Sequence, residues 1–526
     1  MRIRLMGFRS GVWHPPQHGR RPSAGNCNVG GDGHLQQREG SSRALFLLWL
    51  WQDAALGHRP NERRASMSTT ITAQARPEHQ DAQAASRPGN HIVIVLFMLS
   101  LTIPPEVWVE LGPIRLPVYR ILLVVMAFPC LFSLLRGRQG GLNLADFLVF
   151  GFALWAAVAL LVNHGGSWWQ FIGLTTVETV VPYLIARTYI QNAQQFEAFV
   201  KLYFIIVLAI LPFALIETLT GHHILREITG QLFGRFTAFE GRPARLGLER
   251  AYGPFVHPIH YGLFCATLVG MLVSMQKTRF AALWRYAVMG VAIFCSLSSG
   301  PLLLFMVQTQ LKIYDVLTRG LKYRWRILSG LVLALYFIID SMTNRTPFHV
   351  IVTYMTLRME SAYNRIYIFE FGMASVQKYP IFGIGLNEWE RPPWMSSSVD
   401  NFWLVIAMRY GVPAFILFVL ALTVIFVRLA RARLQPEQER YRIGWSISMV
   451  GMVFAGATVH FWTELYALFM FMVGASYWMV VQSRRAQASD LARDDVGETA
   501  VTGSWGSRAP RARRWRSGPA NERKAL

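Results

Sequence analysis

The chain has 526 residues, of which 53% are hydrophobic and only 16% are charged. Soluble domains carry about 25% charged residues, so this composition excludes an ordinary soluble enzyme and predicts a multispanning membrane protein. The formal net charge of +22 comes from basic residues beside apolar segments and in the tails, which indicates membrane topology rather than nucleic-acid binding.

Residues 1–90 are expected to form a disordered N-terminal extension. Residues 1–66 are rich in Arg, Gly, His, Pro and Trp and show neither helical nor strand periodicity. Met67 then opens a Ser/Thr/Gln/Ala-rich segment that leads into the first membrane helix. We therefore predict Met67 as the true start of the protein, the alternative being a genuine disordered extension.

About twelve apolar segments are long enough to be considered as membrane helices, since a span needs roughly 20 residues. They predict an all-α fold, a polytopic transmembrane helix bundle over residues 91–482. The segments are 91–109, 117–135, 144–162, 170–188, 200–218, 257–275, 286–299, 301–315, 327–342, 408–428, 443–460 and 464–482.

The distribution of Lys and Arg predicts the orientation of the bundle. Connections rich in these residues alternate with nearly charge-free ones, and the basic set is expected in the cytoplasm. Both termini then lie inside, including a basic, disordered tail over 483–526. Two long loops, 219–256 and 343–407, are expected on the opposite, outer face of the membrane.

Arginine is concentrated in the first of these loops, where the sequence RPARLGLERAYGPFVHPIHYG runs from the loop into the next apolar segment. Arg242, Arg245 and Arg250 lie within this short stretch. A planar guanidinium group binds two phosphate oxygens at once, so the cluster predicts an anionic, phosphate-bearing ligand. A purely structural explanation is that Arg245 pairs with Glu249 and Arg250 with Glu240.

Two histidines follow the arginines at the start of an apolar helix. Pro258 suits the first turn of that helix, which places His257 and His260 at its positive end. They are candidates for a catalytic role. A hydrogen bond at the end of the helix is an equally acceptable explanation.

The second long loop contains a predicted helix over Met359–Val376 that carries Arg365. Tyr379-Pro380 is expected to end the helix, and Gly383 and Gly385 to make a tight turn. Arg365 extends the set of arginines that face the same side of the membrane as the first loop.

Asp400 stands at the start of the next apolar helix. One interpretation is an ordinary N-cap. The other is a carboxylate that accepts a proton from an attacking hydroxyl group.

Four sequence blocks resemble one family. The blocks are RLGLERAYGPFVHPIHYG, SLSSGPLL, RIYIFEFGMASVQKYPIFGIGLNEW and DNFWLVIAMRYGVPAF, in that order. They are similar to the signature blocks of the O-antigen ligase and O-antigen (exopolysaccharide) polymerase superfamily of bacterial membrane proteins. The resemblance covers about residues 92–482.

The resemblance implies a metal-independent, inverting glycosyltransferase without a cofactor, whose donor is a glycan on polyprenyl diphosphate. By motif, Arg242, Arg245, Arg250 and Arg365 would hold the diphosphate. The family's ligases have a catalytic histidine just before the Asn of the Asn-aromatic-Leu helix, where this sequence has Asp400. The base is therefore Asp400, His257 or His260.

The expected partners are the lipid bilayer, a polyprenyl-diphosphate-linked glycan, and a glycan or lipid acceptor, with a polysaccharide flippase and a chain-length regulator in the same pathway. A polymerase is favoured over a ligase that transfers glycan to lipid A core. Two other classes remain, a polysaccharide-related transporter or flippase and a non-enzymatic scaffold of an export complex.

Overall fold

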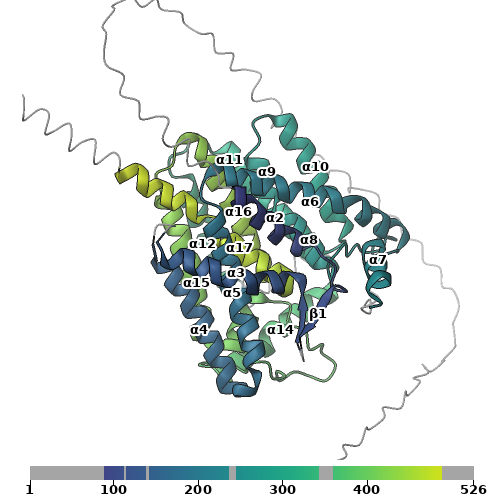
Figure 1. Ribbon diagram of the computed structural model, residues 1–526. Coiled ribbons are helices and arrows are strands. Elements are labelled where there is room, and N and C mark those ends of the chain that lie inside the picture. The colour runs from purple at the N-terminus through teal and green to yellow at the C-terminus, as the bar shows by residue number, and fades with distance from the viewer. Residues whose placement is uncertain (1–87, 112–113, 138–140, 236–243, 343–358, 489–526) are drawn as a thin grey trace, which may run out of the picture. The chain divides into compact units, whose positions relative to one another are not determined.

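A computed structural model describes residues 88–111, 114–137, 141–235, 244–342 and 359–488 (Figure 1). The chain divides into two units, Met1–Glu78 and His79–Leu526, and all described residues belong to the second. Arg242, the predicted start at Met67 and most of the predicted basic tail lie outside the described residues, so these predictions stay predictions.

The described residues are mostly helical, as predicted. The helices in the first half of the chain are α2 (Pro88–Ser100), α3 (Val118–Leu135), α4 (Leu144–His164), η1 (Gly166–Trp168), α5 (Trp169–Tyr189), α6 (Ala193–Thr220), α7 (Ile224–Phe233), α8 (Pro258–Thr267) and α9 (Val269–Ser274). Those in the second half are α10 (Arg279–Cys295), α11 (Ser299–Leu317), α12 (Arg324–Met342), α14 (Met359–Lys378), α15 (Phe402–Arg431), α16 (Pro436–Ala455) and α17 (Thr463–Gly474).

Within the described ranges, six helices are long and apolar enough to cross a membrane, which indicates a multi-pass membrane protein. They are Val118–Leu135, Leu144–His164, Ala193–Thr220, Arg324–Met342, Phe402–Arg431 and Thr463–Ala488. The other predicted segments fall on helices that are shorter, less apolar or more charged, so the number of twelve spans stays a prediction. Inside the bundle, α4 packs along α15 and α5 along α17 (Figure 1).

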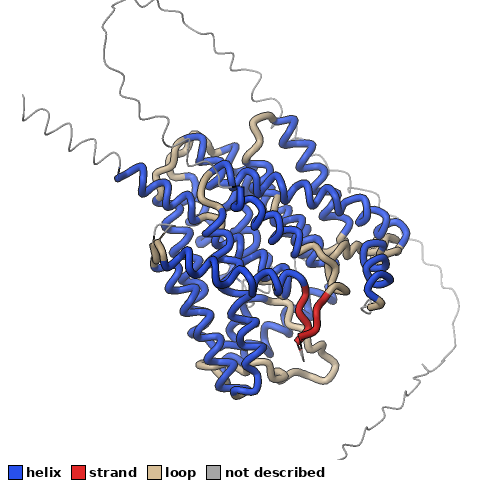
Figure 2. The backbone as a smooth tube through the Cα atoms, viewed as in Figure 1, coloured by secondary structure: helices blue, strands red, loops and turns tan. Residues whose placement is uncertain are grey.

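The one pair of strands among the described residues was not predicted. Strands β1 (Trp108–Leu111) and β2 (Ile114–Pro117) pair antiparallel and appear in red in Figure 2. They replace the end of the predicted span 91–109, because α2 already ends at Ser100. Pro104 and Pro105 follow, and proline can neither donate a backbone hydrogen bond nor continue a helix.

The predicted span 408–428 begins too late, because α15 begins at Phe402 and is broken at Gly411. The backbone of Gly411 has φ 83° and ψ 170°, which are not helical angles. A turn from the preceding loop fills the break, since Val412 N donates to Pro380 O (2.8 Å) and Ile384 N donates to Met408 O (2.8 Å). Residues 402–410 therefore form a separate half-helix, which we call the outer half of α15.

The predicted span 257–275 is also divided in two, between α8 and α9. Side chains from two neighbouring helices satisfy backbone groups at this break. Gln308 accepts from Gly270 N (2.7 Å) and donates to Ala266 O (2.7 Å), and Ser448 accepts from Met271 N (3.2 Å). Polar residues inside these apolar helices thus stabilise a helix break and are not available for a ligand.

Candidate functional site

The arginines of the first loop lie against the turn between α10 and α11. Ala251 N donates to Cys295 O (2.9 Å), which fixes the loop to the end of α10. Arg245 donates from Nη1 to Leu297 O (2.7 Å), and Arg250 donates from Nη2 to Ser298 Oγ (2.6 Å). The blocks RLGLERAYG and SLSSGP, which are separate in the sequence, therefore form one substructure.

These two arginines differ in exposure. Arg250 is buried, with 5% of its surface exposed, and its contacts hold the turn in place. Arg245 is half-buried and reaches the surface of the same substructure. Among the described residues, Arg245 forms no ion pair with Glu249, so the pairing of these two residues considered above is wrong. The pairing of Arg250 with Glu240 stays open, because Glu240 lies outside the described residues.

Glu217, near the end of α6, fixes the next part of the loop. Its buried carboxylate accepts hydrogen bonds from Tyr252 N (2.7 Å) and Gly253 N (2.9 Å). Both bonds are charge-assisted, which makes them stronger than ordinary amide hydrogen bonds. Glu217 thus positions the segment between Arg250 and His257.

Arg365 reaches the same region from the second long loop. It lies on α14 and is buried, with 8% exposed. The pKa of the Arg365 guanidinium lies below its usual range, chiefly because the side chain is buried. The charge of Asp400 opposes this lowering, and the charge of Arg245 adds to it. The charges of Asp400 and Arg245 therefore both act on Arg365.

Asp400 is not the N-cap of α15, so that interpretation is wrong. The cap is Asn401, whose Oδ1 accepts from Leu404 N (3.0 Å). Asp400 is half-buried and accepts from Ser398 Oγ (3.1 Å). Its carboxylate thus lies outside the helix, and its charge acts on Arg365.

The two predicted histidines take different positions. His257 is the N-cap of α8, as expected from Pro258, and its Nδ1 accepts from Ile259 N (3.1 Å). His260 is fully buried and packs against Trp462, with 4.0 Å between the ring centroids. Direct contact with a ligand is therefore easier for His257 than for His260.

Sequence reasoning missed Trp462, His460 and Arg409. His460 and Trp462 lie in the connection between α16 and α17, and the sequence VHFW at the end of the predicted span 443–460 was a signal that could have found them. Arg409 lies in the outer half of α15, and no carboxylate among the described residues is within ion-pair distance of it. Burial of His460 is the main cause that lowers the pKa of its imidazole to about 3, and the charge of Arg409 lowers this pKa further.

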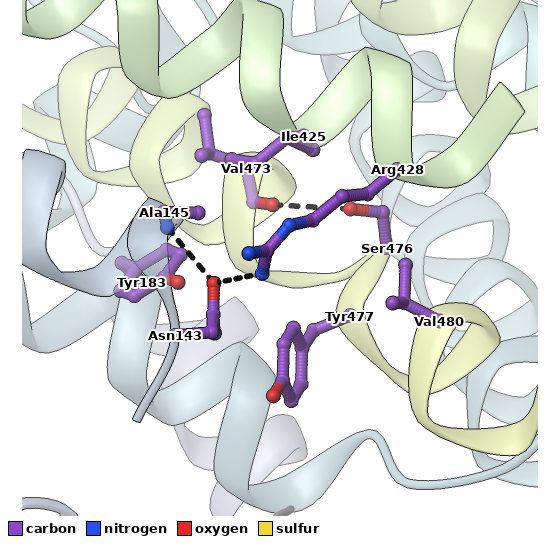
Figure 3. A pocket seen from close by; sticks show the side chains of 9 residues that line it. All are labelled: Asn143, Ala145, Tyr183, Ile425, Arg428, Val473, Ser476, Tyr477 and Val480. Carbon is purple, nitrogen blue, oxygen red and sulfur yellow. Dashed lines mark hydrogen bonds between the residues drawn. The ribbon is translucent and has the colours of Figure 1, made fainter. Parts of the chain in front are cut away.

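A small cavity lies at the other end of α4 and α15, away from these arginines (Figure 3). Arg428 crosses it and donates from Nη1 to Asn143 Oδ1 (2.7 Å). Behind it, Asp146 pairs with Arg187 and accepts from Tyr183 Oη (2.6 Å). The cavity is thus closed by an internal polar network that joins the start of α4 to α5 and α15.

Four arginines, Arg245, Arg250, Arg365 and Arg409, belong to the described part of this region. The charge of Asp400 acts on Arg365, while Glu217 is engaged with the backbone. No protein-family model matches the chain, and no curated protein matches it. The resemblance to the O-antigen ligase and polymerase superfamily consequently rests on the four sequence blocks, and the assignment of function rests on the site.

Proposed function

We propose that this protein is a membrane glycosyltransferase that polymerises or transfers glycan repeat units carried on polyprenyl diphosphate, on the periplasmic face of the bacterial inner membrane. The observation that supports it most directly is that the charges of Arg245, in the first loop, and of Asp400, just before α15, both act on the buried Arg365 of α14. Two guanidinium groups from distant parts of the chain repel each other, so an anion that binds both would relieve this repulsion.

A diphosphate suits this arrangement by charge and by shape. Arg245 and Arg365 would each bind phosphate oxygens through a forked pair of N–H groups. Arg250 holds the turn between α10 and α11, which Arg245 also contacts, and would add its charge to the site. Positive groups fixed around the leaving diphosphate stabilise the charge that develops as its bond to the sugar breaks.

The transfer step then needs only an acceptor hydroxyl and a base. The hydroxyl oxygen attacks the anomeric carbon from the face opposite the diphosphate. The new glycosidic bond forms as the bond from carbon to diphosphate oxygen breaks, and the configuration inverts. Asp400 accepts the hydroxyl proton, and the lipid diphosphate leaves.

Asp400 is favoured over the histidines as this base for two reasons. The Nδ1 of His257 already accepts from Ile259 N, and His260 is fully buried. The carboxylate of Asp400, by contrast, is half-buried beside Arg365. Because the family's ligases have a histidine at this position, Asp400 also favours a polymerase, with a ligase acting on lipid A core as the alternative.

A transporter is less well supported. The intramembrane carboxylates that would suggest one are engaged in structural contacts: Asp146 with Arg187, Glu178 with Arg120 and Tyr119, and Glu217 with the backbone. The break in α15, a feature that transporters use to bind substrates, is filled here by residues 380–385.

Sizing of surface polysaccharide in a strain that lacks the gene tests the proposal. Complementation with Arg365→Ala or Asp400→Asn should leave short glycans, with the protein still in the membrane. Arg319→Ala is the matched control, because Arg319 is exposed between α11 and α12. Single repeat units in the deletion strain indicate a polymerase and unattached long chains indicate a ligase, whereas unchanged chain length in both site variants refutes the proposal.

A further inference from the structure

Three histidine rings surround Trp462 at the end of the bundle that carries the candidate site. The centroid of the Trp462 ring lies 4.0 Å from that of His260, 5.5 Å from that of His460 and 6.2 Å from that of His257. His257 and His260 come from the start of α8, and His460 and Trp462 from the connection between α16 and α17. Two segments about 200 residues apart thus build one cluster.

Among the described residues, two members of this cluster leave hydrogen-bonding capacity unused. Neither ring nitrogen of the fully buried His260 has a hydrogen-bond partner among the described residues, and the buried Nδ1 of His460 has none either. Burial of an unpartnered polar group is unfavourable, and a phenylalanine would fill the same space without that cost. Two such imidazoles in one cluster point to a polar group that they bind from outside the chain.

The cluster is accessible from one side. His257, His460 and Trp462 are half-buried, and only His260 is completely covered. A molecule that approaches from solvent therefore meets these three rings before it meets His260. His260 becomes reachable if the indole of Trp462 turns aside.

The cluster also adjoins the proposed transfer site. Phe402 N, two residues after Asp400, donates to Gly456 O (2.8 Å) and Val459 O (3.2 Å), so one connection positions both His460 and the start of α15. The ring centroids of Phe402 and His460 are 6.3 Å apart. On the other side, a Cβ atom on Gly300 would lie 2.8 Å from the side chain of Val459, which joins this connection to the turn that holds Arg250.

The chemistry of the cluster fits a neutral polyol. A neutral imidazole offers one donor and one acceptor, the pair that a hydroxyl group requires. The indole ring offers a flat apolar surface for the face of a sugar ring. Among the described residues, no three His, Cys, Asp or Glu side chains are placed to hold a metal ion.

We propose that His260, His460 and Trp462 form the subsite for the acceptor sugar, with Trp462 packed on the sugar ring and the two imidazoles bound to its hydroxyl groups. This inference rests on the proposed function and specifies its second substrate as a neutral glycan. In this arrangement the attacking hydroxyl approaches from the Trp462 side, while the arginines bind the diphosphate of the donor.

Two probes test the inference on the full-length protein in lipid nanodiscs. Methyl hexopyranosides, applied singly at millimolar concentration and followed by saturation-transfer difference NMR, report on the acceptor subsite. Farnesyl diphosphate, followed by calorimetry, reports on the arginines. We expect at least one hexoside to bind, and His260→Phe and His460→Phe to weaken it about tenfold or more while diphosphate affinity is retained. His222→Phe is the matched control, since the His222 side chain is 74% exposed.

The outcomes separate the inference from the proposed function. Two results refute the inference and leave the proposed function standing. In the first, farnesyl diphosphate binds but no hexoside does. In the second, the hexoside binds both phenylalanine variants as well as it binds the wild type. If neither probe binds, the proposed function itself fails. His260→Phe should leave the unfolding temperature unchanged or raise it. If it instead lowers that temperature, the decision passes to His460→Phe alone, and hexoside binding by this variant as tight as that of the wild type refutes the inference.

Discussion

A Cβ atom placed on Gly411 would lie 2.0 Å from the carbonyl oxygen of Ile381, far closer than two such atoms can approach. The turn after α14 is therefore embedded in the break of α15. Because α14 carries Arg365 and Asp400 lies two residues before the outer half of α15, this contact fixes Asp400 relative to Arg365. The fold thus connects a helix break to the geometry of the proposed site.

Gly411→Ala is predicted to destabilise the protein severely. The substitution introduces both the clash with Ile381 and a side chain at a φ of 83°, which L-residues rarely adopt. We expect a cost of about 3 kcal/mol or more, seen as a large fall in the unfolding temperature in nanodiscs. Gly330→Ala, in α12 with no atom near the added Cβ, is the control and should be neutral or slightly stabilising. A Gly411→Ala protein as stable as wild type would contradict this account of the break.

The helices and the polar loops could be predicted from the sequence because both depend on local composition. The helix over 359–376, its end at Tyr379-Pro380 and the glycine turn all agree with the structure. The breaks at Gly411 and Leu268 could not be predicted, since they depend on partners far away in the chain, Pro380 and Gln308. His460 and Trp462 were missed for the same reason, because only the packing of α8 against the α16–α17 connection reveals their relation to His260.

Glu217→Gln is predicted to weaken both the protein and its binding of diphosphate. The amide replaces a carboxylate that accepts from two backbone N–H groups, so we expect a loss of about 1.5–3 kcal/mol in the free energy of unfolding. The loosened segment lies directly after Arg250, so the affinity for farnesyl diphosphate should fall although Glu217 itself is not expected to touch the ligand. Thermal unfolding and calorimetry measure the two effects.

Glu249→Gln provides the control for this prediction. Glu249 is an exposed carboxylate in the same loop, and only its backbone N–H bonds to α6, at Thr218 O (3.1 Å). Its replacement removes the same charge without loss of a buried hydrogen bond. Equal effects of the two substitutions would show that net charge, and not the anchoring of Tyr252 and Gly253, is responsible.

The stability of the protein is predicted to fall below about pH 6.5 through His460. Burial first, then the charges of Arg409 and His260, lower the pKa of His460 to about 3, so its imidazole stays neutral in the folded protein. In the unfolded chain the ordinary pKa is about 6.5, so the unfolded state takes up a proton that the folded state does not. Between pH 7 and pH 5 this difference removes about 2 kcal/mol of stability.

Replacement of the imidazole should reduce that pH dependence. His460→Gln is expected to lose less stability than wild type between pH 7 and pH 5, as measured by unfolding temperature in nanodiscs. His222→Gln, at an exposed position, should behave as wild type. If His460→Gln and wild type lose the same stability over this range, the neutral state assigned to His460 is wrong.

A double-mutant cycle on Arg245 and Arg365 tests the central claim most directly, with geranylgeranyl diphosphate as the ligand and binding to nanodisc-embedded protein measured by calorimetry. We predict that Arg245→Ala and Arg365→Ala each weaken binding about tenfold or more. The loss of binding free energy in the double variant should differ from the sum of the two single losses by at least about 1 kcal/mol. Geranylgeraniol, which lacks the diphosphate, should bind all four proteins alike. Strictly additive effects, or an affinity that neither substitution changes, would show that the two arginines do not share one diphosphate.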